Sequence, residues 1–142
     1  MLKRNASAVW NGDLKQGTGQ ISTASGALEN TQYSFATRFE NGVGTNPEEL
    51  IAAAHAGCFS MALSGQLTTA GHPPESVNTT ATVSMDKTEA GFTVTAVHLD
   101  VTARVPGIDQ QGFETAANNA KTGCPISRLL KADITMSARL EQ

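Results

Sequence analysis

Hydrophobic and polar residues follow three different patterns along this chain. Over residues 1–45, short apolar stretches alternate with glycine-containing turns, which is typical of strands. The clearest turn signal is Asn11-Gly12-Asp13. The alternation within residues 32–40 predicts a strand, one face of which would be formed by Tyr33, Phe35, Thr37 and Phe39. Arg38 would then lie on the opposite face.

Residues 46–71 predict a long helix. Asn46 suits the N-cap, Pro47 the first helical position and Glu49 the third position of a capping box. Gly71 suits the end of the helix. After Glu49 the segment is almost uncharged and rich in alanine and leucine. A helix that is apolar or small nearly all round is expected to be buried on most of its faces.

The remainder of the chain predicts strands followed by helices and a last strand. The expected elements are strands at 79–85 and 92–105, helices at 110–121 and 124–130, and a strand at 133–140. This order predicts an α+β fold with a largely antiparallel sheet. The 142 residues contain no linker or repeat, so we expect a single domain over residues 1–142.

Charge and composition exclude several classes of partner. The net charge is -3 and the aromatic residues are one Trp, one Tyr and five Phe, so neither nucleic acid nor an anionic membrane is expected as a partner. No uninterrupted apolar run approaches the roughly 20 residues of a membrane span. The N-terminal residues show no targeting pattern. We therefore expect a cytoplasmic protein, whose thiols are kept reduced.

Two cysteines, Cys58 and Cys124, stand 66 residues apart. In a reducing compartment they need not form a structural disulfide, and each could simply be a small buried residue. Cys58 lies in the middle of the apolar helix, where burial raises a thiol pKa and makes the thiol inert unless a cation is near. Arg38 precedes that helix directly and is the candidate cation, because an arginine keeps its charge.

The second cysteine and the acidic residues have both structural and chemical interpretations. Cys124 precedes Pro125 and so occupies an N-cap, a position that favours a thiolate but that could equally be only a cap. Of the two carboxylates in the first turn of the long helix, Glu48 is free of the capping role and is the better candidate to orient Arg38. His55 and Cys58 could share a helix face, yet two ligands do not make a zinc site, so no metal is expected.

Three segments resemble the OsmC/Ohr family of peroxidases: residues 39–51, 53–63 and 120–127. The two cysteine motifs at their spacing are the specific part of this resemblance. It implies an OsmC-like fold, in which antiparallel sheets pack around a long central helix that carries Cys58. It also implies an intertwined homodimer with its active sites at the subunit interface.

The resemblance further implies that the protein reduces organic hydroperoxides to alcohols. Cys58 would be the thiol that attacks the peroxide, and Cys124 would resolve the resulting sulfenic acid to a disulfide. Arg38 and Glu48 would activate Cys58; in the Ohr branch the arginine comes from an earlier loop, whereas the setting of Arg38 resembles the OsmC branch. A lipoyl-type dithiol, such as a lipoylated protein or dihydrolipoamide, would regenerate the thiols, with no bound cofactor.

Two other functions remain compatible with the sequence. A redox sensor would form the same disulfide but turn over once and pass a signal on. A non-catalytic binding domain would keep the fold while its cysteines merely pack.

Overall fold

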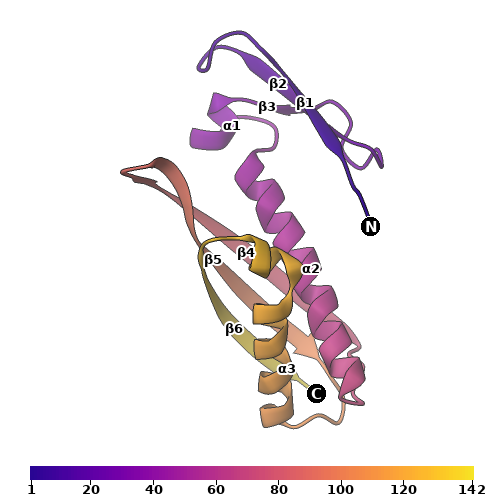
Figure 1. The fold of residues 1–142 in the computed structure, drawn as a ribbon. Coiled ribbons are helices and arrows are strands. Elements are labelled where there is room, and N and C mark those ends of the chain that lie inside the picture. The colour runs from indigo at the N-terminus through magenta and orange to yellow at the C-terminus, as the bar shows by residue number, and fades with distance from the viewer. The chain divides into compact units, whose positions relative to one another are not determined.

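The computed structural model describes residues 1–142, which fall into two compact units, Met1–Leu50 and Ile51–Gln142 (Figure 1). Each unit has its own three-stranded sheet. The long helix α2, Pro47–Thr69, begins in the first unit and continues into the second. The single domain expected from the sequence stays a prediction.

The first unit is built on an antiparallel sheet. Its strands are β1 (Ala6–Asn11), β2 (Thr18–Thr23) and β3 (Thr31–Tyr33), in that order. The predicted turn after β1 is confirmed, with Gly12 at a φ of 97°. The rings of Trp10 and Tyr33 lie 5.5 Å apart, over Gly19 of β2. A Cβ atom at Gly19 would come within 2.4 Å of the Tyr33 ring, so only glycine permits this packing.

The strand predicted over residues 32–40 is wrong in its second half, where the chain forms the short helix α1 (Phe35–Phe39). Ser34 and Thr37 form a capping box: each side-chain oxygen accepts the backbone N–H of the other residue, at 3.2 and 2.8 Å. The Phe35 and Phe39 rings, four residues apart, pack at 4.8 Å between centroids. These local contacts favour a helix despite the alternating pattern.

The long helix α2 begins as the sequence predicts. The Asn46 side chain accepts the N–H of Glu49 at 2.7 Å, and Pro47 is the first helical residue. The capping box is only half formed, because the Glu49 carboxylate accepts the hydroxyl of Thr45 at 2.8 Å instead of reaching back to the cap. The chain leaves the helix through Gly71, at a φ of 87°.

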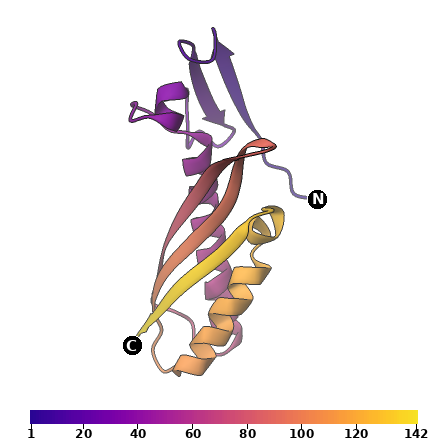
Figure 2. The same ribbon diagram turned by 90° about the vertical axis from the view of Figure 1, so that its left-hand side faces the viewer.

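The second unit contains a sheet with helices on one face (Figures 1 and 2). Its strands, in the order β4-β5-β6, are β4 (Ser76–Thr88), β5 (Gly91–Arg104) and β6 (Asp133–Glu141). The expected antiparallel pairing holds for β4 with β5. β5 and β6 are parallel, and the long connection that parallel strands need is formed by α3 (Gln110–Gly123) and α4 (Pro125–Leu129).

One stripe of α2 packs into the core of this unit. The buried residues of α2 recur every fourth position, and they are His55, Phe59, Leu63 and Leu67. Phe59, Leu63 and Leu67 meet the inward side chains of β5 and the apolar face of α3, and each of them contributes about 1.5–3 kcal/mol when fully buried.

The expectation that α2 would be buried on most faces is wrong within this chain, since Met61 is 79% exposed. By length and composition alone α2 could cross a membrane, a property that core helices of soluble proteins share.

Candidate active site

Helices α2 and α4 bring the two cysteines together. Both are free thiols, and their Sγ atoms lie 2.8 Å apart, with the Cys124 thiol donating toward Cys58. A disulfide bond measures about 2.05 Å, so it would form here with a sulfur displacement of less than ~1 Å. Cys124 is fully buried, whereas Cys58 is partly exposed. Any reagent that approaches this pair from solvent therefore reaches Cys58 first.

The start of α4 determines how the cysteines meet. Cys124 is the N-cap of α4 and Pro125 follows it at the first helical position, as the sequence predicts. The Cys124 side chain accepts no capping hydrogen bond. A backbone hydrogen bond from Ile126 goes to Cys58 instead. The amino end of α4 thus supports the sulfur of Cys58 rather than that of its own cap residue.

The surroundings of Cys58 raise its thiol pKa above the ordinary value of 9.0, chiefly through burial. The adjacent Cys124 thiol adds to the rise in the Cys58 pKa, first through the hydrogen bond between the two side chains and then, to a smaller extent, through charge repulsion between the two sulfurs. The hydrogen bond from Ile126 acts in the opposite direction but does not reverse the balance. Within the second unit, then, Cys58 is held in its less reactive protonated form.

Arg38 and Glu48 form an ion pair in the first unit. The Nε atom of Arg38, in α1, donates to Oε1 of Glu48, in the first turn of α2, at 2.6 Å. The terminal nitrogens of the Arg38 guanidinium have no hydrogen-bond partner, and the side chain is 41% exposed. Oε2 of Glu48 is buried without a partner. The pair is therefore held at one point, and the guanidinium keeps donors for a further anionic group.

The predicted separation of Arg38 from the aromatic side chains is wrong. Because α1 is a helix, the guanidinium lies over the Phe39 ring, 5.4 Å from its centroid. This places Arg38 at the edge of an apolar pocket of about 210 Å³ in the first unit. The pocket is lined by Trp10, Leu14, Tyr33, Ser34, Phe35, Arg38, Phe39 and Pro47. The sequence pattern did not reveal the pocket, because it assigned residues 35–39 to a strand.

A buried histidine lies beside the cysteine pair. His55 is 0% exposed, and its Nε2 atom lies 2.7 Å from Oγ of Ser127 in α4. Burial lowers the pKa of the imidazole, which favours its neutral form. In the sequence His55 stood out only as an unsuitable zinc ligand; its spacing of three residues from Cys58 was the available signal. No group of three or more His, Cys, Asp or Glu side chains is placed to hold a metal ion.

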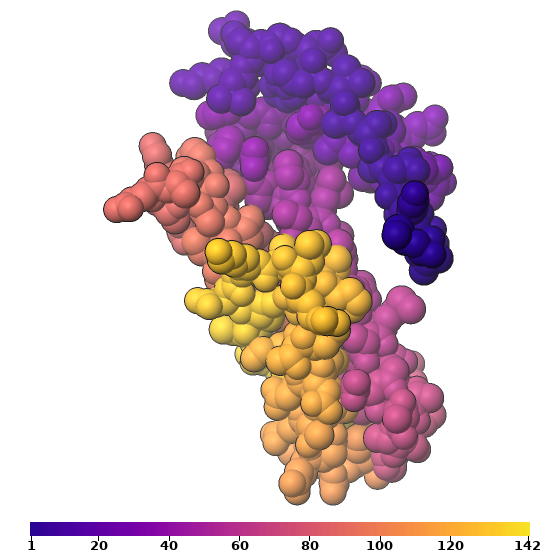
Figure 3. All heavy atoms as spheres, viewed as in Figure 1, coloured from indigo at the N-terminus to yellow at the C-terminus, as the bar shows by residue number.

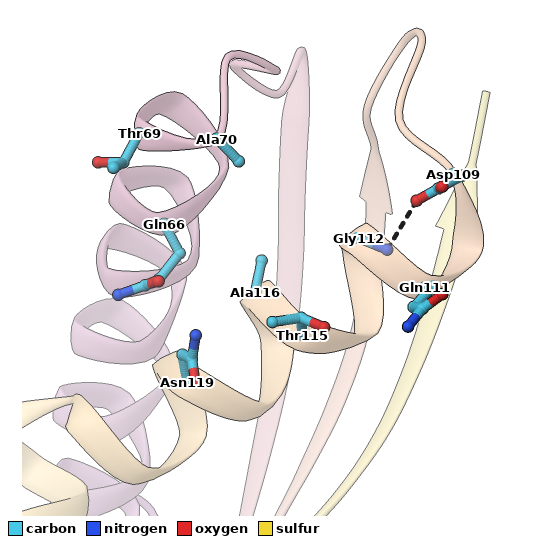
Figure 4. A pocket seen from close by; sticks show the side chains of 9 residues that line it. All are labelled: Gln66, Thr69, Ala70, Asp109, Gln111, Gly112, Thr115, Ala116 and Asn119. Atoms are coloured by element: carbon cyan, nitrogen blue, oxygen red, sulfur yellow. Dashed lines mark hydrogen bonds between the residues drawn. The ribbon is translucent and has the colours of Figure 1, made fainter.

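A second hollow, of about 450 Å³, lies between the C-terminal part of α2 and α3 (Figure 4). In the space-filling view α3 forms a surface ridge beside this part of α2 (Figure 3). Amide and hydroxyl side chains line much of the hollow, and its carboxylate, on Asp109, caps α3 by accepting the N–H of Gly112 at 2.7 Å. The hollow contains neither cysteine, so it is separate from the thiol site.

Comparison with known proteins identifies the family. Residues 39–139 match the family model described as OsmC-like protein. The chain belongs to this family. It is 51% identical over 140 residues to Peroxiredoxin OsmC of Escherichia coli K12, with 99% of this chain and 98% of that protein covered. It is 29% identical to an organic hydroperoxide resistance protein of Xanthomonas axonopodis, with 70% and 68% of the two chains covered.

Solved structures of the family share the fold. The organic hydroperoxide resistance protein OhrB of Bacillus subtilis superimposes with a TM-score of 0.68 at 23% identity, covering 96% of this chain and 98% of that one. The mixed α+β architecture expected from the sequence is therefore confirmed. Membership gives the chain a peroxiredoxin-like, peroxidase-type activity.

Proposed function

We propose that this protein reduces organic hydroperoxides to alcohols, with Cys58 as the peroxidatic thiol and Cys124 as the resolving thiol. The observation that carries the proposal is the 2.8 Å separation of two free sulfurs on different helices. A packing role alone does not require two thiols in contact. The family membership and the name of the Xanthomonas relative support organic hydroperoxides as the substrate class.

The reaction has two steps in this proposal. The Cys58 thiolate attacks one peroxide oxygen, the O–O bond breaks and the alcohol leaves after taking up a proton, which converts Cys58 to a sulfenic acid. The Cys124 sulfur then attacks the Cys58 sulfur. The S–S bond forms, the S–O bond breaks, and the oxygen leaves as water with the Cys124 proton. The short distance between the sulfurs favours the second step over further oxidation.

Activation of Cys58 is assigned to Arg38. The environment of Cys58 raises its pKa, so a neighbouring cation is needed to supply thiolate at neutral pH. The unpaired terminal nitrogens of Arg38 suit this role, and Glu48 orients the guanidinium by its bond to Nε. Arg38 and Glu48 would reach Cys58 either within one chain or across a homodimer.

The apolar pocket beside Arg38 is proposed to hold the organic part of the hydroperoxide. Its volume of about 210 Å³ and its aromatic walls suit an alkyl or aryl group. Burial of such a group contributes roughly 25 cal/mol per Å² of apolar surface. Hydrogen peroxide has no such group, so it should be the poorer substrate.

Regeneration is assigned to a lipoyl-type dithiol, such as a lipoylated protein or dihydrolipoamide. Cys58 is the more accessible of the two sulfurs, so the dithiol would attack there and release Cys124 first. The reducing cytoplasm is the compartment in which such a dithiol and the reduced cysteines coexist. The exposed apolar side of α2, including Met61, supports a homodimer that covers this helix.

A steady-state assay tests the proposal. The full chain is supplied with cumene hydroperoxide and either dihydrolipoamide or dithiothreitol, and peroxide loss is followed over many turnovers. Sustained consumption that disappears in Cys58→Ser supports the enzyme. Consumption of one equivalent followed by arrest, with a dithiol present, would identify a redox sensor instead. If no peroxide is consumed at all, not even one equivalent, the protein is a non-catalytic domain.

A further inference from the structure

His55 is a buried histidine to which the proposed reaction gives no part. Its side chain is fully buried and its Nδ1 atom has no hydrogen-bond partner. A buried nitrogen without a partner is destabilising, and an apolar side chain of similar size would fill the same position without that cost. The bond from Nε2 to Ser127, at 2.7 Å, is therefore the feature that distinguishes this histidine from a simple core residue.

The His55–Ser127 contact parallels the contact between the cysteines. His55 precedes Cys58 by three residues in α2, and Ser127 follows Cys124 by three residues at the start of α4. Residues three apart are neighbours on a helix surface. The two helices are thus joined by two direct side-chain contacts, one between sulfurs and one between an imidazole and a hydroxyl, about one helical turn apart.

The position of the Cys124 sulfur depends on the position of α4 as a whole. This helix is five residues long, and the Cys124 side chain has no capping hydrogen bond to hold it. Ile126 and Leu130 pack α4 against the core, but apolar packing is non-directional. Two directional bonds also join α4 to α2. The bond from the Ile126 backbone ends on the Cys58 sulfur itself, whereas the bond between His55 and Ser127 lies away from both sulfurs and opposes sliding or rotation of α4 relative to α2.

We propose that His55 and Ser127 are positioning residues for the resolving step, an inference that rests on the proposed roles of Cys58 and Cys124. Their hydrogen bond keeps Cys124 aimed at the Cys58 sulfur after an oxygen atom has been added to it. The peroxide step uses Cys58 and does not require this alignment. When resolution is delayed, a second hydroperoxide oxidises the sulfenic acid to a sulfinic acid and leaves as a second alcohol.

Four variants separate this role from general support of the fold. His55→Leu replaces the imidazole with an apolar side chain of similar size and so removes the hydrogen bond. Ser127→Ala removes the same bond by deleting the hydroxyl. His55→Gln places an amide nitrogen near the position of Nε2 and should restore the bond. Ser60→Ala is the matched control: it removes a 2.8 Å side-chain bond that joins α2 to Thr79 of β4, on the sheet side.

The reduced full chain is mixed rapidly with one equivalent of cumene hydroperoxide. Peroxide loss is followed first, and disulfide formation is followed by acid quenching, alkylation and mass analysis. His55→Leu and Ser127→Ala should consume peroxide at the wild-type rate but form the disulfide about tenfold more slowly, the factor expected for one lost hydrogen bond. With excess peroxide they should accumulate more sulfinic acid on Cys58. His55→Gln and Ser60→Ala should behave like the wild type.

Each alternative result has a definite meaning. Wild-type resolution in both His55→Leu and Ser127→Ala overturns the inference, and so does an equal slowing of both steps, which indicates general support of the fold. If His55→Leu fails to fold, the rates of disulfide formation in Ser127→Ala and in His55→Gln decide whether the inference holds. Peroxide consumption that persists in Cys58→Ser contradicts the proposed function itself, whatever the His55 variants do.

Discussion

Arg38 and Glu48 meet through one nitrogen and one oxygen only, Nε and Oε1, at 2.6 Å. A two-point pairing would have engaged a terminal nitrogen of the guanidinium as well. The single contact fixes the direction of the Arg38 side chain while its terminal nitrogens stay available. Glu48 is therefore suited to orienting the guanidinium toward a second anion, which the proposed function identifies as the Cys58 thiolate.

Replacement of Arg38 by alanine should slow the peroxide step at pH 7. Without the guanidinium, burial and Cys124 keep the Cys58 pKa above its ordinary value of 9.0, so less thiolate is present. Each unit of pKa increase reduces the thiolate fraction about tenfold. Raising the pH should restore part of the rate, because the thiolate then forms without Arg38. The measurement is the pH dependence of Cys58 alkylation and of single-turnover peroxide reduction.

Related variants show whether charge or orientation is lost. Arg38→Lys keeps the charge, so its rate for the peroxide step at pH 7 should lie between those of the wild type and Arg38→Ala. Glu48→Gln should slow the peroxide step less than Arg38→Ala does, because the guanidinium stays but loses the carboxylate that orients it. Arg4→Ala, in the same unit, controls for the loss of one positive charge. Identical titration of Cys58 in the wild type and Arg38→Ala would mean that another cation activates the thiol.

The two cysteines should divide the reaction between them. Cys58→Ser should abolish peroxide consumption, because no other thiol is partly exposed. Cys124→Ser should still consume about one equivalent of peroxide and leave a sulfenic acid on Cys58 that dimedone traps. Mass analysis of the trapped protein gives the site of the label. A sulfenic acid on Cys124 in the Cys58→Ser variant would reverse the assignment.

The main elements of the second unit and the boundaries of α2 could be predicted from the sequence because their signals are strong and local. The Asn46-Pro47 start of α2 and its end near Gly71 follow from backbone requirements. Cys124 could likewise be placed at an N-cap from Pro125 alone. The direction of β6 could not, because a crossover of two helices permits either orientation until the strands pair.

Features that depend on contacts between side chains could not be predicted in this way. The Ser34–Thr37 capping box makes α1 a helix even though its residues alternate like a strand. The approach of Cys58 to Cys124 depends on how α4 packs against α2, which no local pattern contains. The partner of His55 was not evident for the same reason, since Ser127 is 72 residues away.

Removing an apolar wall of the pocket beside Arg38 should weaken the preference for organic substrates. Leu14 lines this pocket and is 67% exposed, so Leu14→Ser should leave the fold intact. A loss of about 1 kcal/mol of apolar contact corresponds to about a fivefold lower kcat/KM for cumene hydroperoxide. The kcat/KM for hydrogen peroxide should not change. Val43→Ser, on an exposed residue outside the pocket lining, is the control; equal effects of the two substitutions would exclude the pocket as the substrate site.

The buried His55 should make the protein less stable as the pH falls. Burial lowers the imidazole pKa in the folded state below the ordinary value of 6.5, which the unfolded chain retains. Between these two pKa values the unfolded chain binds a proton that the folded chain does not, so the free energy of unfolding decreases as the pH falls through this window. Above about pH 6.5 this residue adds no pH dependence. The slope cannot exceed about 1.4 kcal/mol per pH unit for one group.

Urea unfolding between about pH 5 and 8 measures this effect, a range that brackets the titration of histidine. His55→Leu has no titrating group at this position, so the difference in unfolding free energy between the wild type and the variant should shift in favour of the variant as the pH falls below 6.5. His72→Gln removes a histidine from the loop after α2 and should leave the contribution of His55 in place. A difference between the wild type and His55→Leu that stays constant over the whole range would show that His55 keeps the same protonation in the folded and unfolded states.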